Sequence, residues 1–498
     1  MKKLAKLLGF DPVQKQTSVR TEIIAGIVTF LAMAYILTVN PNQILYAGTA
    51  DVRWSSLFIA TALGAIIGTL LMAFLAKMPL AQASGMGLNS LVGSIVGGGL
   101  GFYAYGFEFS VGQAFTMVLI SGVIFLLLSL INIKGKTFRE LVFDGMPVAV
   151  RSAISVGIGL FIAYIGFQNA GFIVANQYTQ VALVDFTNWG EGSTAAAASV
   201  AIIGLFLIAI LDKLKVKGSV IIGIIGATIA GIPMGVTNLA VLKGDQAGIT
   251  WKFWESFANF FTVGETSVFG SFVEGFKGFP EGSLFTVVML IITMCMIDMF
   301  DTMGTIVGCC GGNRILSDEN DKPHNYGKIM ICDAVATCSG AMLGTSTVTT
   351  FVESGAGVSA GGRTGLTAFT TAVMFFLAMF AMPLFAVIPG AATAAALIYV
   401  GVLMMKNNIK SINFSNAINA TAAFLTIVVM PLSYSITKGI GVGMISFTLM
   451  SSAAYVIDAI KYAVNKNGET EKPKWEVSVV ALIVTALFCV YFFVPVAF

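Results

Sequence analysis

The sequence predicts an all-α polytopic membrane protein of about fourteen transmembrane helices. Of the 498 residues, 57% are hydrophobic and only 11% are charged, and the mean hydropathy of +0.88 is far above that of soluble domains. Uncharged apolar windows of roughly 17 to 25 residues recur along the chain, which is the length a helix needs to cross the hydrocarbon core. Hydrophobicity does not alternate with period two, so the crossings are helices and not barrel strands.

The apolar windows form two sets of seven with a mixed segment between them. The first set covers 23–39, 55–76, 80–97, 112–131, 150–174, 195–211 and 217–235. The second set covers 284–307, 326–344, 346–361, 365–388, 391–405, 416–436 and 438–460. A further apolar segment, 477–497, leaves open whether it spans the membrane. The predicted divisions are an N-terminus (1–22), a first repeat (23–235), an extracytoplasmic connecting segment (236–283), a second repeat (284–460) and a C-terminal segment (461–498).

Lysine and arginine mark the predicted orientation. They gather after even numbers of crossings, at 2–20, 134–151, 213–217, 314–328, 406–410 and 461–474. This distribution predicts a cytoplasmic N-terminus in a multi-pass protein of the cell membrane. Because the net charge of +3 is spread over short loops, nucleic acid is not expected as a partner. The six cysteines form no C-x-x-C pair and His324 is the single histidine, so we expect neither a metal site nor a cofactor.

Two glycine-rich segments interrupt the two sets at corresponding places. They read "PLAQASGMGLNSLVGSIVGGGLG" and "GTSTVTTFVESGAGVSAGGRTG". They superimpose without a gap, which places Asn89 on Glu353 and Ser90 on Ser354. Seven crossings separate the copies, and an odd number inverts the second copy relative to the first. Inverted repeats with one short, broken helix in each copy indicate a secondary transporter whose substrate site lies near the membrane midplane.

Two aspartates occupy one apolar helix in "MCMIDMFDTMGTIVG". Asp298 and Asp301 are three residues apart and therefore share a helix face. A carboxylate in the membrane is costly, so such residues usually face a cavity and mark a substrate or ion path. We expect a direct role for Asp301. Asp298 either shares that role or accepts hydrogen bonds from a neighbouring helix.

A glutamate and two hydroxyl residues lie in the second glycine-rich segment. Glu353 follows Thr350 and precedes Ser354 in "STVTTFVESGAG". Irregular backbone survives in a membrane only where it lines a cavity or is buried in protein, so Glu353 is either a helix cap or, as we favour, a ligand to a polar substrate. Asp333 in "ICDAVATCSG" is a third intramembrane acid or, alternatively, a helix residue near the cytoplasmic loop.

These carboxylates suggest a substrate and a coupling ion. A carboxylate accepts two adjacent N–H donors, which purine and pyrimidine bases present side by side. Neighbouring carboxylates disfavour each other's charged form, so one of them can hold a proton near neutral pH. A proton is therefore the expected coupling ion, and its candidate carriers are Asp298, Asp301, Glu353 and Asp333.

Five motifs in order along nearly the whole chain resemble one known family. They are "TFLAMAYILTVNP", "ASGMGLNSLVG", "FDGMPVAVRSAISVGIGLFIAYIGFQNAG", "DMFDTMGTIVG" and "TSTVTTFVESGAGVSAGGRTGLTA". The chain resembles the adenine, guanine and hypoxanthine permeases of the AzgA-like branch of the nucleobase:cation symporter-2 family. The resemblance implies fourteen helices in two inverted sets of seven. It also implies a core domain of helices 1–4 and 8–11 and a gate domain of helices 5–7 and 12–14.

The resemblance also implies a substrate site between the third and tenth helices, close to the eighth. Carried over by position, the acid of the eighth helix is Asp301 and the acid of the tenth is Glu353. Phe351 matches an aromatic position of the base pocket, and Asn89 matches the polar position of the third helix. Uracil and xanthine branches often carry His or Asp four residues after the first acid. Thr305 stands there in this chain, which suits the purine branch and leaves the proton-coupling group open.

The sequence thus predicts a transporter, not an enzyme, that imports a purine base by proton symport while the core moves against the gate. Guanine and hypoxanthine are the favoured substrates and adenine is an alternative. An anion carrier of the same fold should present few acids in its pocket. An intramembrane aspartyl protease needs two acids on facing helices, whereas Asp298 and Asp301 lie on one. Proton or sodium coupling, and a monomer or a homodimer in the bilayer, stay open.

Overall fold

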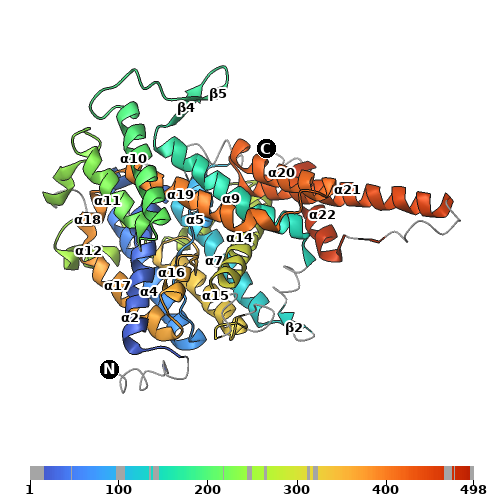
Figure 1. The fold of residues 1–498 in the computed structure, drawn as a ribbon, viewed down its shortest axis with the longest axis horizontal. Coiled ribbons are helices and arrows are strands. Elements are labelled where there is room, and N and C mark those ends of the chain that lie inside the picture. The colour runs from blue at the N-terminus through green and yellow to red at the C-terminus, as the bar shows by residue number, and fades with distance from the viewer. Residues whose placement is uncertain are drawn as a thin grey trace.

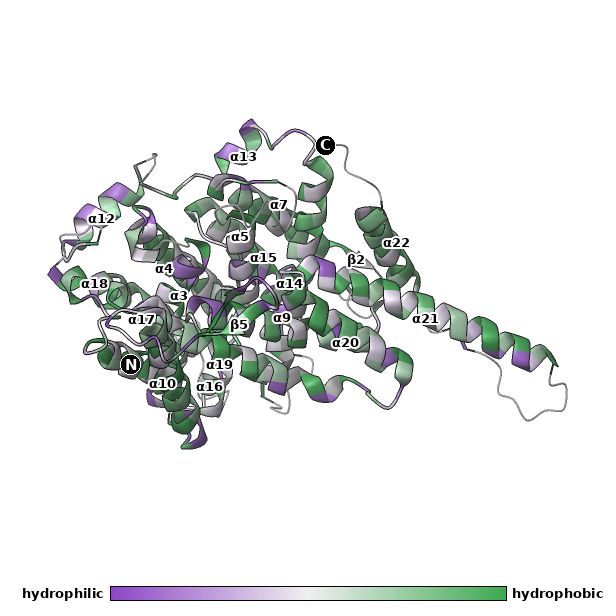
Figure 2. Ribbon diagram, turned by 90° about the horizontal axis from the view of Figure 1, so that it is seen from above, coloured by the Kyte–Doolittle hydropathy of each residue, from purple (hydrophilic) through white to green (hydrophobic). Residues whose placement is uncertain are grey.

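The computed structural model describes most of the chain, and nearly all of its regular structure is helical. The described residues are 10, 16–45, 48–96, 107–133, 136–137, 145–216, 218–243, 249–262, 266–310, 315–317, 323–464, 474–475 and 477–493. Figure 1 shows the helices packed into one body from which α21 projects. Figure 2 shows hydrophobic residues along most of these helices, with hydrophilic residues frequent in α12 and α13. In the described part of the chain, six helices are each long and apolar enough to cross a membrane, and shorter apolar helices accompany them.

The helices of the first half follow the predicted order. They are α2 (Val19–Met33), α3 (Ile36–Ile44), α4 (Trp54–Leu71), α5 (Met86–Val96), α7 (Val111–Leu130), α9 (Val148–Asn169), α10 (Thr194–Lys213) and α11 (Ser219–Gly231). Short elements between them are η1 (Gly48–Ala50), a π-helical turn η2 (Met72–Ala76), the strands β2 (Asn132–Ile133) and β3 (Lys136–Thr137), and the hairpin of β4 (Ile173–Asn176) and β5 (Gln180–Leu183). Side chains fix several helix starts. At α7, for example, Ser110 and Gln113 form a capping box.

The second half is likewise mostly helical, with short elements between the helices. Its helices are α14 (Leu284–Cys310), α15 (Tyr326–Leu343), α16 (Ser354–Ser359), α17 (Gly365–Met379), α18 (Met382–Ala386), α19 (Gly390–Asn408), α20 (Ala417–Leu432), α21 (Ile436–Val464) and α22 (Val479–Phe493). The connecting segment holds η3 (Leu239–Lys243), α12 (Phe253–Phe260) and α13 (Val273–Lys277), and η4 (Ile409–Ser411) follows α19.

Four predicted windows are interrupted in the structure. The window 23–39 breaks at Ala34 and Tyr35, between α2 and α3. The window 365–388 divides into α17 and α18, and Pro383, which has no amide hydrogen to donate, stands in the first turn of the second helix. The windows 80–97 and 346–361 each consist of a short strand followed by a short helix. Their glycine-rich sequences predicted these last two interruptions, whereas the breaks in the other two windows were not predicted.

The two interrupted segments meet as an antiparallel strand pair. β1 (Gln82–Ser84) pairs with β6 (Val348–Thr350), with Gln82 opposite Thr350 and Ser84 opposite Val348. All of these strand residues are buried. Extended backbone inside a membrane protein must find hydrogen-bond partners within the protein, and here each segment supplies them to the other. The strand pair therefore holds the starts of α5 and α16 beside one another.

The helices pack in two groups. A first helix group contains α2, α4, α7, α15, α16 and α17, and a second helix group contains α9, α10, α11, α19, α20 and α21. α14 contacts members of both groups as well as β6. Small residues permit close approach within a group: a Cβ added to Gly401 of α19 would collide with the carbonyl of Gly159 in α9.

Candidate functional site

The four intramembrane acids differ in exposure. Asp298 and Asp333 are 1% and 0% exposed, whereas Asp301 and Glu353 remain partly accessible to solvent. Asp298 and Asp301 lie on α14, Asp333 lies on α15, and Glu353 immediately precedes α16. Asp301 is close enough to Asp333 and Glu353 to feel their charges. Asp301 and Glu353 are thus the two acids that a solute could reach.

Asp333 is the centre of a buried hydrogen-bond network. Its carboxylate accepts from the Thr302 hydroxyl at 2.8 Å and from Gln82 Nε2 at 3.1 Å. It also accepts from the hydroxyls of Thr349 at 3.2 Å and Thr350 at 3.4 Å. These donors come from α14, β1 and β6, so one carboxylate joins both strands of the pair to α14 and α15. Asp333 has at least this structural role, and its role in proton coupling stays a prediction.

Asp298 also contacts a neighbouring helix. The Thr337 hydroxyl of α15 lies 3.2 Å from Asp298 Oδ2 and 3.2 Å from the carbonyl of Val348 in β6. Asp298 therefore accepts a hydrogen bond from an adjacent helix, which is one of the two arrangements that the sequence left open. Although it lies one turn from Asp301, it belongs to the packed interior.

Glu353 has a partner that the sequence reasoning missed. The Tyr35 hydroxyl donates to Glu353 Oε1 at 2.5 Å, and the Tyr35 side chain is buried in the break between α2 and α3. Tyr35 is part of the motif "TFLAMAYILTVNP", but nothing in that motif indicated its partner. The hydrogen bond fixes one oxygen of the Glu353 carboxylate.

A glycine lies in close packing beside Asp301. A Cβ added to Gly85 would lie 2.6 Å from Thr349 Cγ2 and 3.8 Å from Asp301 Oδ2. Any larger residue at position 85 would therefore collide with β6. Gly85, which is buried, thus lets the end of β1 pack against Thr349 and close to the Asp301 carboxylate.

The other predicted substrate-binding residues are buried. The Ser354 hydroxyl accepts from the amide of Ala81 at 3.0 Å, and the Thr350 hydroxyl is bonded to Asp333 and Gln82. The Asn89 side chain donates to the carbonyl of Ser84 at 3.3 Å and accepts from the hydroxyl of Ser346. Phe351 is also buried. The structure thus gathers all six residues around the strand pair, and of the six only Asp301 and Glu353 are partly exposed.

This arrangement can accept hydrogen bonds from a small polar solute. Two carboxylates approach from α14 and from the start of α16, and paired N–H donors are their natural ligands. In the described residues, no cluster of three or more histidine, cysteine, aspartate and glutamate side chains could hold a metal ion.

Comparisons with known proteins agree with this architecture. The model of a permease family named for xanthine and uracil permeases matches residues 20–442. The adenine permease AdeP of Escherichia coli is 35% identical over 435 residues, which is 87% of each chain. The guanine/hypoxanthine permease PbuO of Bacillus subtilis is 36% identical over 447 residues, which is 89% of this chain and 94% of the relative.

Solved structures share the fold. The transmembrane domain of the cyanobacterial bicarbonate transporter BicA superimposes with a TM-score of 0.56 at 16% identity, over 85% of this chain and 96% of that one. SLC26A9 superimposes with a TM-score of 0.55 at 12% identity, over 92% of this chain and 70% of that one. At these identities the likeness concerns the fold alone. It confirms the predicted fold class, an all-α polytopic membrane protein.

Proposed function

Because this chain belongs to the xanthine/uracil permease family, a family of multi-pass membrane transporters of nucleobases, we propose that it imports purine bases by proton symport. The proposed base site lies between Asp301 and Glu353. The single observation that supports it is that Asp301 and Glu353 are partly exposed residues, whereas Asp298 and Asp333 are buried. Tyr35 occupies one oxygen of Glu353, which directs the remaining acceptor positions toward the solute.

Guanine and hypoxanthine are the bases we propose. Both present a ring N–H beside the carbonyl, and guanine adds an amino group next to that N–H. A carboxylate accepts such an edge directly, whereas adenine has an acceptor nitrogen at the same ring position. Relatives named for adenine and for guanine and hypoxanthine are about equally similar to this chain, so the donor pattern of the base is the argument that separates them.

We propose that a proton accompanies the base. Asp301 lies near the charges of Asp333 and Glu353 in a buried setting, where a second or third negative charge is unfavourable. Protonation of Asp301 or Glu353 would relieve that repulsion while the loaded site changes sides. In this proposal the first helix group forms most of the core, the second forms the gate, and the N-terminus is in the cytoplasm of the cell.

Uptake measurements test this function. We expect cells that lack other purine permeases to accumulate labelled hypoxanthine when they express the protein and to lose that uptake with Glu353→Ala, because the main acceptor of the base is gone. Glu255→Ala, at an exposed glutamate of α12, is the matched control and should keep full uptake. Wild-type uptake by Glu353→Ala would refute the proposed site.

The same assay tests the coupling ion. A protonophore should abolish concentrative uptake, whereas replacing sodium with potassium in the medium should leave it unchanged. Uptake that depends on the sodium gradient and is insensitive to the protonophore would identify sodium, and not the proton, as the coupling ion. Unlabelled guanine should compete better than adenine if the donor edge is what the carboxylates recognise.

A further inference from the structure

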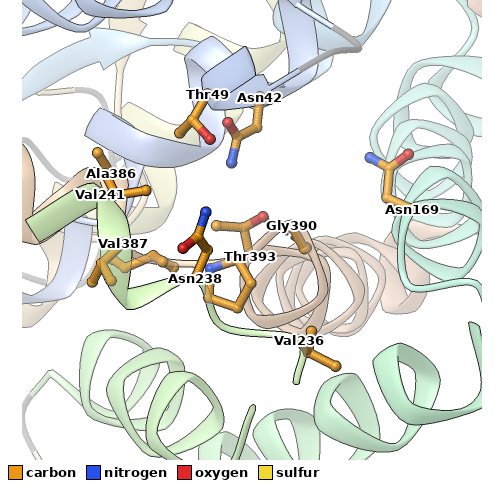
Figure 3. A pocket seen from close by; sticks show the side chains of 12 residues that line it. Asn42, Thr49, Asn169, Val236, Asn238, Val241, Ala386, Val387, Gly390 and Thr393 are labelled. Carbon is orange, nitrogen blue, oxygen red and sulfur yellow. Dashed lines mark hydrogen bonds between the residues drawn. The ribbon is translucent and has the colours of Figure 1, made fainter. Parts of the chain in front are cut away.

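One cavity has a lining that includes none of the four acids. It has a volume of about 350 Å³ and is lined by Asn42, Thr49, Asn169, Val236, Asn238, Val241, Ala386, Val387, Ile388, Pro389, Gly390 and Thr393 (Figure 3). We propose that this cavity is a peripheral binding site for a purine base, recognised through its acceptor atoms. The proposal rests on the proposed function and adds a site to it.

The second helix group and elements outside both groups contribute to this cavity. Asn169 is the last residue of α9, and Gly390 and Thr393 lie in the first turn of α19. Asn42 comes from the last turn of α3, and Asn238 from the segment that follows α11. On the orientation predicted from the loop charges, these element ends face the outside of the cell. A solute that entered from outside would contact α3 and the second helix group here before it reached the acids.

Two asparagine side chains have a fixed orientation in the cavity. Asn42 Oδ1 accepts from the indole N–H of Trp54 at 2.8 Å, and Asn238 Oδ1 accepts from the amide of Ala240 at 3.0 Å. An indole N–H and a peptide N–H can only donate, so each bond identifies the oxygen and leaves the amide nitrogen on the other side. Figure 3 shows the nitrogens of Asn42 and Asn238 pointing into the cavity, with Asn169 at the opposite wall.

The lining suits a neutral, flat solute that carries acceptors. The twelve described residues that line the cavity are all uncharged, which disfavours an anion such as bicarbonate. Valine, isoleucine and proline side chains provide apolar contact for a ring, and amide N–H groups are donors for ring nitrogens and carbonyl oxygens. Cavities of this volume are typical of small-molecule sites, and this one has a lining of mixed polar and apolar residues.

The two sites would form hydrogen bonds to different edges of one base. The carboxylates of Asp301 and Glu353 can only accept from N–H donors when ionised, whereas the asparagine nitrogens of the cavity can only donate. A purine carries both kinds of edge. A base held through its acceptors at the cavity would therefore keep its donor edge free for the carboxylates.

Kinetics of two variants test the peripheral site. Asn238→Asp keeps an oxygen for the amide of Ala240 but replaces the N–H donors by a charged carboxylate oxygen, and Asn169→Ala removes an exposed side chain without adding charge. Each should raise the KM for hypoxanthine uptake by roughly three- to ten-fold, the value of one hydrogen bond, and leave the maximal rate unchanged. Asn188→Asp, in an exposed loop outside the cavity, is the control and should match the wild type. Wild-type KM values in both cavity variants would overturn the proposal.

A labelling experiment separates this site from the carboxylates. The purified full-length Asn169→Cys protein should react with a thiol reagent in detergent, and hypoxanthine should slow that reaction several-fold. The protection should persist when Glu353→Ala is added, because the cavity binds independently of the acids. Asn188→Cys should react at the same rate with and without hypoxanthine, and the chain without an added cysteine gives the background of the native thiols.

The outcomes distinguish the two proposals. Absence of hypoxanthine uptake by the wild-type protein would contradict the proposed function. Normal uptake with no protection of Asn169→Cys would refute the peripheral site and leave the proposed function standing. Protection that disappears with Glu353→Ala would also refute it, because the effect would then come from binding at the acids.

Discussion

Asp298 and Asp301 lie one turn apart on α14, yet they belong to different environments. Asp298 is buried against Thr337 of α15, and Asp301 is partly accessible beside Gly85. Asp333 and Glu353 differ in the same way. Asp333 is buried and accepts hydrogen bonds that join the strand pair to α14, whereas Glu353 is partly exposed and accepts a hydrogen bond from Tyr35. We therefore propose two purposes for these acids: Asp298 and Asp333 support the architecture, and Asp301 and Glu353 bind the solute. The following substitutions test this division.

The largest effect is expected from Asp333→Ala. It removes the acceptor shared by Gln82, Thr302 and Thr349, and each buried donor left without a partner costs about 1–3 kcal/mol. We expect a loss of stability of about 3 kcal/mol or more, seen as little folded protein by size-exclusion chromatography. Asp458→Ala, at an exposed position of α21, should fold like the wild type. A normal unfolding midpoint for Asp333→Ala would show that Asp333 does not support the architecture.

A smaller effect, on transport and not on folding, is expected from Tyr35→Phe. The substitution removes one hydroxyl that donates to Glu353, and hydrogen bonds to charged groups contribute about 1.5–3 kcal/mol. Hypoxanthine uptake at low concentration should fall by roughly ten- to a hundred-fold, with the unfolding midpoint nearly unchanged. Tyr178→Phe, at an exposed tyrosine between β4 and β5, is the control. Equal uptake by the two variants would show that Tyr35 does not position the carboxylate.

The smallest effect is expected from Asp298→Asn. Asparagine keeps an oxygen for the Thr337 hydroxyl, so stability should change by about 1 kcal/mol or less and uptake by no more than a few-fold. Asp301→Asn, measured beside it, should abolish concentrative uptake. If instead Asp298→Asn uncoupled uptake from the proton gradient while Asp301→Asn did not, the assignment of the two aspartates would be reversed.

The sequence predicted the features that depend on local composition. Apolar windows located the crossings, and glycines marked the two interrupted segments that become β1 with α5 and β6 with α16. It favoured Asp301 for a direct role but could not decide between the two alternatives for Asp298, because helical spacing does not say which neighbour packs against each residue. Nor could it pair Tyr35 with Glu353, which are 318 residues apart and meet only through the tertiary fold.

The lining of the cavity could not be predicted from the sequence either. Asn42, Asn169 and Asn238 come from three separate parts of the chain. Asn169 belongs to a motif quoted for the family resemblance, but that motif gave no indication of a cavity. The three side chains line one cavity only in the folded protein, and their place in its lining identified them.

The pairing of β1 with β6 also constrains biosynthesis. Ala81 and Ser354, which bond beside the strands, are 273 residues apart, so β1 enters the membrane long before its partner exists. At about 5–20 residues per second, the ribosome needs tens of seconds to supply that partner. During this interval the edge of β1 has no partner strand, and a chain truncated before Val348 would never gain one. Closure of the strand pair is therefore the step at which the inserted first half stops being a candidate for chaperones and proteases.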